Sequence, residues 1–207
     1  MAEGANSPPN AVTIAGFNGR RTQSMKNRLF VIHGYQAHPQ SHWFQWLCQQ
    51  FPDTQCQVIA LPHSDCPQVD AWQQALQHAI GQVDEHTFLV AHSLGCVTTL
   101  RYLTLLGRGS ANVGALALVA GFAEKLPNLP QLDAFNDSPL DWQLLRGIER
   151  KLVLLSEDDS VVAPAATAHL SGVWQAPLLR LQGRGHFTSQ DGCHTLPELA
   201  AWLREHM

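Results

Sequence analysis

From Leu29 onward, short apolar runs alternate with longer segments of helical period, and this alternation restricts the chain to few folds. The runs occupy residues 29–33, 56–61, 87–92, 113–120, 151–156 and 178–182. They are almost continuously apolar, as expected of strands that are covered on both faces. The pattern therefore predicts an α/β domain with a mostly parallel sheet of about six strands flanked by helices.

Apolar residues between and after these runs recur at helical spacing and predict the covering helices. The three clearest stripes are Trp43, Trp46, Leu47 and Phe51; then Val69, Trp72, Leu76, Ala79, Ile80 and Val83; and last Leu196, Leu199, Ala200 and Leu203. Thr195 and Glu198 stand at the spacing of a capping box, so we expect them to begin the last helix.

The length of the chain argues for one domain. It has 207 residues, 45% of them apolar, which suffices for a single substantial core. Residues 1–28 contain few large side chains and are expected to form a flexible or loosely packed arm before a domain over 29–207. Two alternatives stay open: residues 11–15 could add a short strand, and Met25 could be the original start.

Charge and hydropathy exclude some partners. The net charge is −4 and the 13 basic residues are scattered, so nucleic acid is not an expected partner. No run approaches the roughly 18 apolar residues of a membrane span, and the polar start lacks the apolar core of a signal peptide. We therefore expect a cytoplasmic protein without a membrane contact, and the sequence leaves any protein partner unknown.

The cysteines form no recognisable framework. There are five, at positions 48, 56, 66, 96 and 193, and no two of them are spaced as C-x-x-C. An odd number at irregular spacings favours neither a metal site nor a disulfide scaffold. We expect all five to be free thiols.

Residues 88–97 predict a buried strand, a turn of small residues with Ser93 at its apex, and a helix over about 94–106. In G-x-S-x-G turns, small flanking residues let the helix approach the strand and expose the serine. Here Ala91 replaces the first glycine, which weakens the motif modestly. The N–H of Leu94, at the helix start, is expected to face the charge that develops on an acyl oxygen.

A second loop is expected beside this turn. His33 and Gly34 end the first predicted strand, and Gly34 permits an unusual backbone turn. If the loop curls over Ser93, the N–H of Tyr35 becomes the second donor to the acyl oxygen.

A serine hydroxyl needs an imidazole to take its proton and a carboxylate to orient that imidazole. Asp159 lies in an acidic loop after the fifth strand, and His186 follows the sixth strand between glycine and phenylalanine. We favour Asp159 as the orienting acid and expect Asp158 and Glu157 to be solvated. The order Ser, Asp, His is the order of such triads in α/β sheets.

The other histidines and cysteines near these motifs are interpreted as structural. His38 and His42 are four apart, but no third ligand stands nearby, so no metal site is expected and packing of the loop is the better interpretation. His92 is expected to point away from the nucleophile and make structural hydrogen bonds. Cys96 and Cys193 lack the strand-to-helix setting of Ser93.

The segment over residues 122–148 breaks the alternation with three prolines and no long helical period. Long connections at strand ends often serve as binding loops or lids, and this one follows the fourth strand. Trp43, Phe122 and Phe187 lie near the predicted active residues and are candidates for the substrate pocket, although Trp43 could equally be a core residue.

The motifs together resemble the α/β-hydrolase superfamily, and within it the small YdeN-like family related to retinoblastoma-binding-protein-type serine hydrolases. The resemblance rests on residues 33–35, 42–44, 91–95, 157–159 and 185–187 and covers residue 29 to the end. It implies Ser93 as nucleophile, Asp159 as acid and His186 as base, with no cofactor. The L-x-C-x-E motif for pocket proteins is absent, so that partner is not implied.

We therefore expect hydrolysis of a carboxylic ester of a small-molecule acyl substrate through an acyl-Ser93 intermediate. Amide, peptide or thioester cleavage by the same triad is the alternative chemistry. A non-catalytic hydrolase-like protein that binds a partner is the alternative of a different class. The natural substrate and the oligomeric state are not indicated by the sequence.

Overall fold

The computed structural model describes residue 1 and residues 26–207. Within these residues, six strands form one sheet in the order β2-β1-β3-β4-β5-β6, and every neighbouring pair is parallel. The strands are β1 (Arg28–Ile32), β2 (Gln55–Ile59), β3 (Thr87–His92), β4 (Ala115–Val119), β5 (Lys151–Ser156) and β6 (Leu178–Leu181). The predicted α/β fold with a six-stranded parallel sheet is confirmed.

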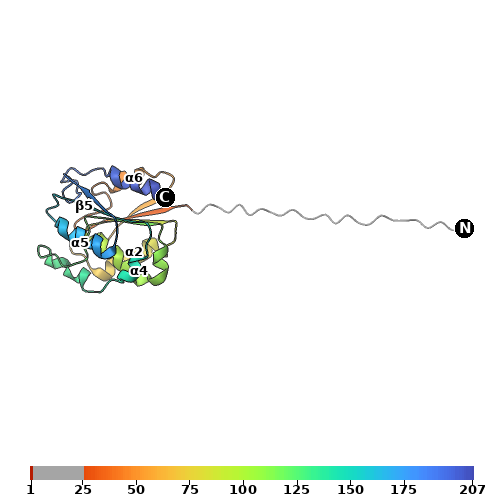
Figure 1. Cartoon of the computed structure of the whole chain (residues 1–207), viewed down its shortest axis with the longest axis horizontal. Helices are drawn as coiled ribbons and strands as arrows, with labels where there is room; N and C mark the ends of the chain where they lie inside the picture. Colours follow the sequence, from red (N-terminus) through yellow and green to blue (C-terminus); the bar gives the residue numbers. More distant parts are fainter. Residues whose placement is uncertain (2–25) are drawn as a thin grey trace.

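Helices cover both faces of the sheet (Figure 1). One face packs against α2 (Val69–Ile80), α3 (Leu94–Leu106), α4 (Trp142–Arg146) and α5 (Pro164–Trp174). The other face packs against α1 (Phe44–Gln49) and α6 (Pro197–His206). Successive strand residues alternate between the two cores: Phe88 and Val90 of β3 face α1 and α6, whereas Leu89 and Ala91 face the larger helical layer.

The degree of burial follows position in the sheet. All six residues of β3 and all five of β4 are buried, because both strands lie inside the sheet and under helices. The edge strands β2 and β6 are only partly buried. Their runs were expected to be covered on both faces, and the edge position explains the difference.

The predicted irregular segment is partly helical. After β4 the chain forms a 3-10 helix, η2 (Pro130–Asn136), and then the short helix α4, whose start is capped by the side chain of Asp141. Another 3-10 helix, η1 (Gly107–Asn112), joins α3 to β4. Leu132 and Phe135 of η2 are buried against the main core, so the segment packs on the domain.

The prediction that all five cysteines are free thiols is wrong for two of them. Cys48, near the end of α1, and Cys56, at the start of β2, form a disulfide with Cα atoms 5.4 Å apart. The turn that reverses the chain between α1 and β2 brings them together, and spacing alone did not reveal this. Disulfides persist mainly in oxidising compartments, so the pair does not support the cytoplasmic location expected from the sequence.

The expected capping box at Thr195 and Glu198 is also wrong. The last helix begins at Pro197 without a side-chain cap, because Glu198 binds the Arg184 guanidinium at 2.7 Å instead.

The predicted arm and the optional strand over 11–15 lie outside the described residues, except for residues 26–28, of which Arg28 opens β1. No described helix is long and apolar enough to cross a membrane.

Candidate active site

The loops that follow β1, β3, β5 and β6 meet at the carboxyl edge of the sheet. The strand order reverses between β1 and β3. The chain continues from β1 to β2 on one side of this point, and from β3 through β4 and β5 to β6 on the other side. In open parallel sheets, ligands bind in the crevice at such a switch point. Ser93 follows β3, Tyr35 follows β1, Asp159 follows β5 and His186 follows β6.

Ser93 lies at a strained turn between β3 and α3. Its φ of 54° is in the region that residues with a side chain rarely adopt. Gly95 makes the turn possible, since a Cβ there would lie 2.6 Å from the carbonyl oxygens of Ile32 and His33. Ala91, in place of the first glycine, is accommodated as a fully buried residue within β3.

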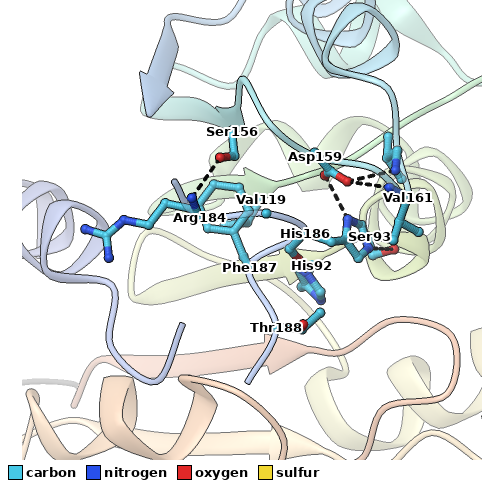
Figure 2. Close-up of polar contacts among 12 residues, drawn as sticks. His92, Ser93, Val119, Ser156, Asp159, Val161, Arg184, His186, Phe187 and Thr188 are labelled. Carbon is cyan, nitrogen blue, oxygen red and sulfur yellow. Dashed lines mark hydrogen bonds and ion pairs between the residues drawn. The ribbon is translucent and has the colours of Figure 1, made fainter. Parts of the chain in front are cut away.

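Ser93, His186 and Asp159 form one chain of hydrogen bonds (Figure 2). Ser93 Oγ lies 2.9 Å from His186 Nε2, and His186 Nδ1 lies 2.8 Å from Asp159 Oδ2. A carboxylate can only accept, so Nδ1 carries the ring proton and Nε2 is free to accept the proton of the serine hydroxyl. Each of the three residues is only 7% exposed.

Asp159 is itself held in place. Its other oxygen, Oδ1, accepts hydrogen bonds of 2.9 Å from the backbone N–H groups of Val161 and Val162. Val161 is labelled in Figure 2. These two bonds leave Oδ2 directed at His186. The structure thus brings together all three residues that the sequence analysis named.

Asp158, by contrast, is exposed, but it is not merely solvated. It accepts hydrogen bonds from the Ser156 hydroxyl and from the backbone N–H groups of Gly183 and Arg184, the latter two at 3.0 and 3.3 Å. The Ser156 hydrogen bond is the main reason why the pKa of Asp158 is lowered. Asp158 therefore ties the loop after β5 to the loop that carries His186.

Asp191 supports the same loop from the other side, and the sequence analysis missed it. Its Oδ2 accepts from the backbone N–H groups of His186 at 2.9 Å and Thr188 at 3.1 Å, and from the Thr188 hydroxyl at 2.7 Å. Gly185 makes room for it, because a Cβ there would clash with the Asp191 carboxyl group. The Thr-x-x-Asp spacing over 188–191, typical of a turn with reciprocal hydrogen bonds, was the available signal.

The pKa of Asp191 reflects these contacts. Burial alone would raise it, but the hydrogen bonds from Thr188 and from the His186 N–H outweigh that effect and hold the pKa below its ordinary value. The side chain is therefore ionised at neutral pH and accepts all of these hydrogen bonds.

His92 lies beneath the site and makes a structural hydrogen bond, as predicted. Its Nε2 lies 2.8 Å from the carbonyl oxygen of His186, so Nε2 carries the proton and donates. Burial, followed by the nearby imidazoles of His186 and His42, holds the pKa of His92 well below its ordinary value. His92 is therefore neutral, and its Nδ1 has no hydrogen-bond partner among the described residues.

Tyr35 and Leu94, the two residues whose backbone N–H groups were predicted to face an acyl oxygen, follow Gly34 and Ser93 directly. Gly34 lets the loop after β1 close on the turn, because a Cβ there would lie 2.8 Å from Cβ of Ser93. Leu94 is the first residue of α3, where an N–H has no partner within the helix. Among the described residues, neither N–H donates a hydrogen bond. Both are thus available to a bound oxygen atom.

A cavity of about 400 Å³ opens onto Ser93 and His186. Leu129, Leu132 and Val161 form apolar parts of its wall. The remaining lining residues are Tyr35, Gln36, His42, Thr188, Gln190 and Asp191. The segment over 122–148, predicted to be a binding loop, thus contributes Leu129 and Leu132.

The three aromatic residues predicted to line the pocket lie in the core instead. Trp43, Phe122 and Phe187 are at most 1% exposed and are not part of the cavity wall. Trp43 donates from Nε1 to the carbonyl oxygen of Phe187 at 3.1 Å, and this hydrogen bond holds the loop after β6 against the core. Their large apolar surfaces are better satisfied by the core, which sequence proximity to the active residues did not indicate.

Comparison with known proteins finds related sequences. Residues 29–205 match the family model described as serine hydrolase. The chain is 34% identical over 176 residues to a Bacillus subtilis (strain 168) protein named Putative hydrolase YdeN, covering 84% of this chain and 92% of the other.

Solved structures show the same fold. The crystal structure of the ydeN gene product from B. subtilis superposes with a TM-score of 0.81 at 33% identity, covering 87% of this chain and 98% of the other. Est1E from Butyrivibrio proteoclasticus has a TM-score of 0.64 at 12% identity, with 87% and 90% covered, which shows likeness of fold alone.

Proposed function

Because this chain belongs to the serine hydrolase family, we propose that it hydrolyses a carboxylic ester of a small acyl substrate through an acyl-Ser93 intermediate. The observation that carries the proposal is the unbroken chain of hydrogen bonds from Asp159 through His186 to Ser93. A hydroxyl is a weak nucleophile at its ordinary pKa, and a neutral imidazole within hydrogen-bond distance is what activates it.

In the acylation step, Ser93 Oγ attacks the ester carbonyl carbon while His186 Nε2 takes the hydroxyl proton. Asp159 stabilises the imidazolium that forms and keeps Nδ1 protonated. The imidazolium then gives its proton to the leaving alkoxide oxygen as the carbon–oxygen bond breaks. The products of this step are the free alcohol and the acyl-Ser93 ester.

The negative charge on the carbonyl oxygen in this step needs fixed donors. The N–H groups of Tyr35 and Leu94 supply them, and the N-terminal end of α3 adds a favourable dipole. Neither N–H has to break a hydrogen bond to another described residue to do so. In the second step His186 activates a water molecule, which releases the acid and restores Ser93.

The cavity limits the size and polarity of the substrate. A volume of about 400 Å³ suits a small ester rather than an extended polypeptide, and its leucine and valine wall suits an apolar group. We therefore place ester hydrolysis ahead of peptide hydrolysis.

The test is a set of butyryl compounds that differ only in the bond cleaved: an oxygen ester, a thioester and an anilide. The purified chain should cleave the oxygen ester, and Ser93→Ala should lose at least the roughly 10⁴-fold enhancement associated with such triads. An anilide cleaved faster than the ester would contradict the proposed bond preference. Wild-type protein that is folded yet cleaves none of the three would contradict the enzymatic function.

A further inference from the structure

His42 lines the active cavity but takes no part in the proton transfers of the proposed reaction. It lies between the loop after β1 and helix α1, with a φ of 54°, so the backbone holds it in a strained conformation. Its ring packs edge-on against Phe44 and His92, with centroid separations of 5.2 and 5.5 Å. The ring is thus fixed by its surroundings on one side.

The protonation of the ring is fixed by one hydrogen bond. The backbone N–H of Ser189 lies 3.0 Å from His42 Nδ1. A backbone N–H can only donate, so Nδ1 is the unprotonated nitrogen and the ring proton of neutral His42 is on Nε2. Burial, and then repulsion by the His186 imidazole, lowers the pKa of His42 to about 4, so the ring is neutral at physiological pH.

The Nε2–H group of His42 is a donor without an acceptor. Among the described residues nothing accepts a hydrogen bond from it, and the atom is not sealed away from solvent. His42 shares the cavity of about 400 Å³ with Ser93 and His186. Solvent can reach this donor in the free protein, and a substrate that fills the cavity and displaces that solvent must supply the acceptor in its place.

The position of His42 indicates which half of an ester it meets. His186 Nε2 must protonate the leaving oxygen, so the alcohol half leaves on the His186 side of Ser93. His42 accepts from Ser189 in the loop that carries His186, and the rings of His42 and His186 both pack against His92, with centroid separations of 5.5 and 4.9 Å. Among the cavity residues there is no lysine or arginine, and Asp191 adds a negative charge, so an anionic group is disfavoured there.

We infer that His42 Nε2–H binds an uncharged oxygen acceptor in the alcohol half of the substrate. The substrate class is then a carboxylic ester whose alcohol carries a further ether, hydroxyl or carbonyl oxygen. This inference rests on the proposed ester hydrolysis and adds to it the recognition of the leaving group.

The test uses two butyrate esters of equal chain length, 2-methoxyethyl butyrate and n-butyl butyrate. They differ by one ether oxygen in place of a methylene group. The measured quantity is the ratio of kcat/KM for the methoxyethyl ester to that for the butyl ester. In His42→Phe, which keeps the aromatic ring, this ratio should fall about fivefold from its wild-type value, as expected for the loss of one neutral hydrogen bond.

Two variants make the result decisive. His38→Phe, at an exposed position in the same loop, should keep the wild-type ratio. His42→Asn is the second removal of the donor, since asparagine tolerates a positive φ and its amide is too short to replace Nε2. It should lower the ratio as His42→Phe does, and it provides the test if His42→Phe does not fold.

The outcomes separate the two proposals. If His42 only supports the loop after β6, its removal lowers kcat/KM for both esters alike and leaves the ratio unchanged, which overturns the inference but not the ester hydrolysis. A second pair of esters, n-butyl methoxyacetate and n-butyl butyrate, differs by one ether oxygen in the acyl half. If removal of His42 changes the kcat/KM ratio of this pair only, the assignment to the alcohol half is overturned. A wild-type protein that cleaves none of these esters contradicts the proposed function, and the inference falls with it.

Discussion

Asp158 and Asp159 are adjacent in the chain yet hold different parts of the loop that carries His186. Asp159 Oδ2 lies 2.8 Å from the imidazole Nδ1 of His186, whereas Asp158 accepts from the backbone N–H groups of Gly183 and Arg184 at 3.0 and 3.3 Å. One carboxylate thus orients the ring and the other orients the backbone. This division makes the two residues a matched pair for mutagenesis.

Asp159→Asn should lower kcat for ester hydrolysis by about 10⁴, with a smaller effect on KM. The amide places an N–H where a carboxylate accepted, so the imidazole adopts the wrong tautomer and cannot take the serine proton. Asp158→Asn keeps an acceptor oxygen for the backbone N–H groups and should change kcat by less than about tenfold. Steady-state kinetics of the two variants would show the reverse ranking if Asp158 were the orienting acid.

Asp191→Ala should lower kcat about tenfold or more, because the His186 and Thr188 N–H groups lose their shared acceptor and the catalytic imidazole loses its fixed position. Asp137→Ala, at an exposed ion pair with Lys125, is the control and should leave kcat unchanged. Equal kcat values for the wild type and Asp191→Ala would show that the loop holds its position without this side chain.

The lowered pKa of Asp191 adds a dependence on pH. A carboxyl whose pKa is lower in the folded state stabilises the fold above its ordinary value of 3.8, and this contribution is lost as the pH falls through the lowered value. The stability difference between wild type and Asp191→Asn, measured by urea unfolding, should therefore shrink below pH 4. A difference that grows in acid would contradict the assigned direction.

The buried neutral His92 predicts a different pH dependence. Its pKa is well below the ordinary 6.5, so the folded state resists protonation while the unfolded state accepts it. The free energy of unfolding should therefore fall as the pH drops from 7.5 to 5.5, by about 1 kcal/mol for this residue. Urea unfolding of His92→Phe should show a shallower fall than the wild type. Parallel pH profiles of the two proteins would show that His92 is not the source.

Gly95→Ala should destabilise the protein by about 2 kcal/mol or more and remove most activity. The added methyl group would lie 2.6 Å from the backbone carbonyl oxygens of Ile32, at the end of β1, and of His33, so helix α3 must move away from the end of β1. Gly109→Ala is the control, because nothing lies within 4 Å of its added methyl group. Thermal unfolding of the two variants checks the difference, and an unaltered Gly95→Ala protein would contradict the close approach.

The sequence predicted the parts of this molecule that follow from local pattern. The strands β3 and β5 and the helix α3 were located to the residue, since each combines an apolar run or stripe with a clear boundary. The sequence placed Ser93, Asp159 and His186 after the third, fifth and sixth strands, and the structure brings them within hydrogen-bond distance because the carboxyl ends of parallel strands meet at one edge.

What the sequence did not predict depends on contacts between distant segments. The hydrogen bonds of Asp191 to the His186 loop and the disulfide between Cys48 and Cys56 require the folded backbone to bring their partners together. The pocket was misassigned to Trp43, Phe122 and Phe187 because proximity in sequence says nothing about which face of a loop a side chain occupies. Leu129 and Leu132 reach the cavity from a segment without helical period.

Covalent labelling distinguishes an activated Ser93 nucleophile from an ordinary serine. A fluorophosphonate probe, which reacts with serine only where a base and donors to the phosphoryl oxygen are in place, should modify the native protein once, and peptide mapping should place the adduct on Ser93. Ser93→Ala should be unlabelled with a thermal midpoint close to that of the wild type, since the hydroxyl contributes little packing. Folded wild-type protein that remains unlabelled, or an adduct on another residue, would show that Ser93 is not an activated nucleophile.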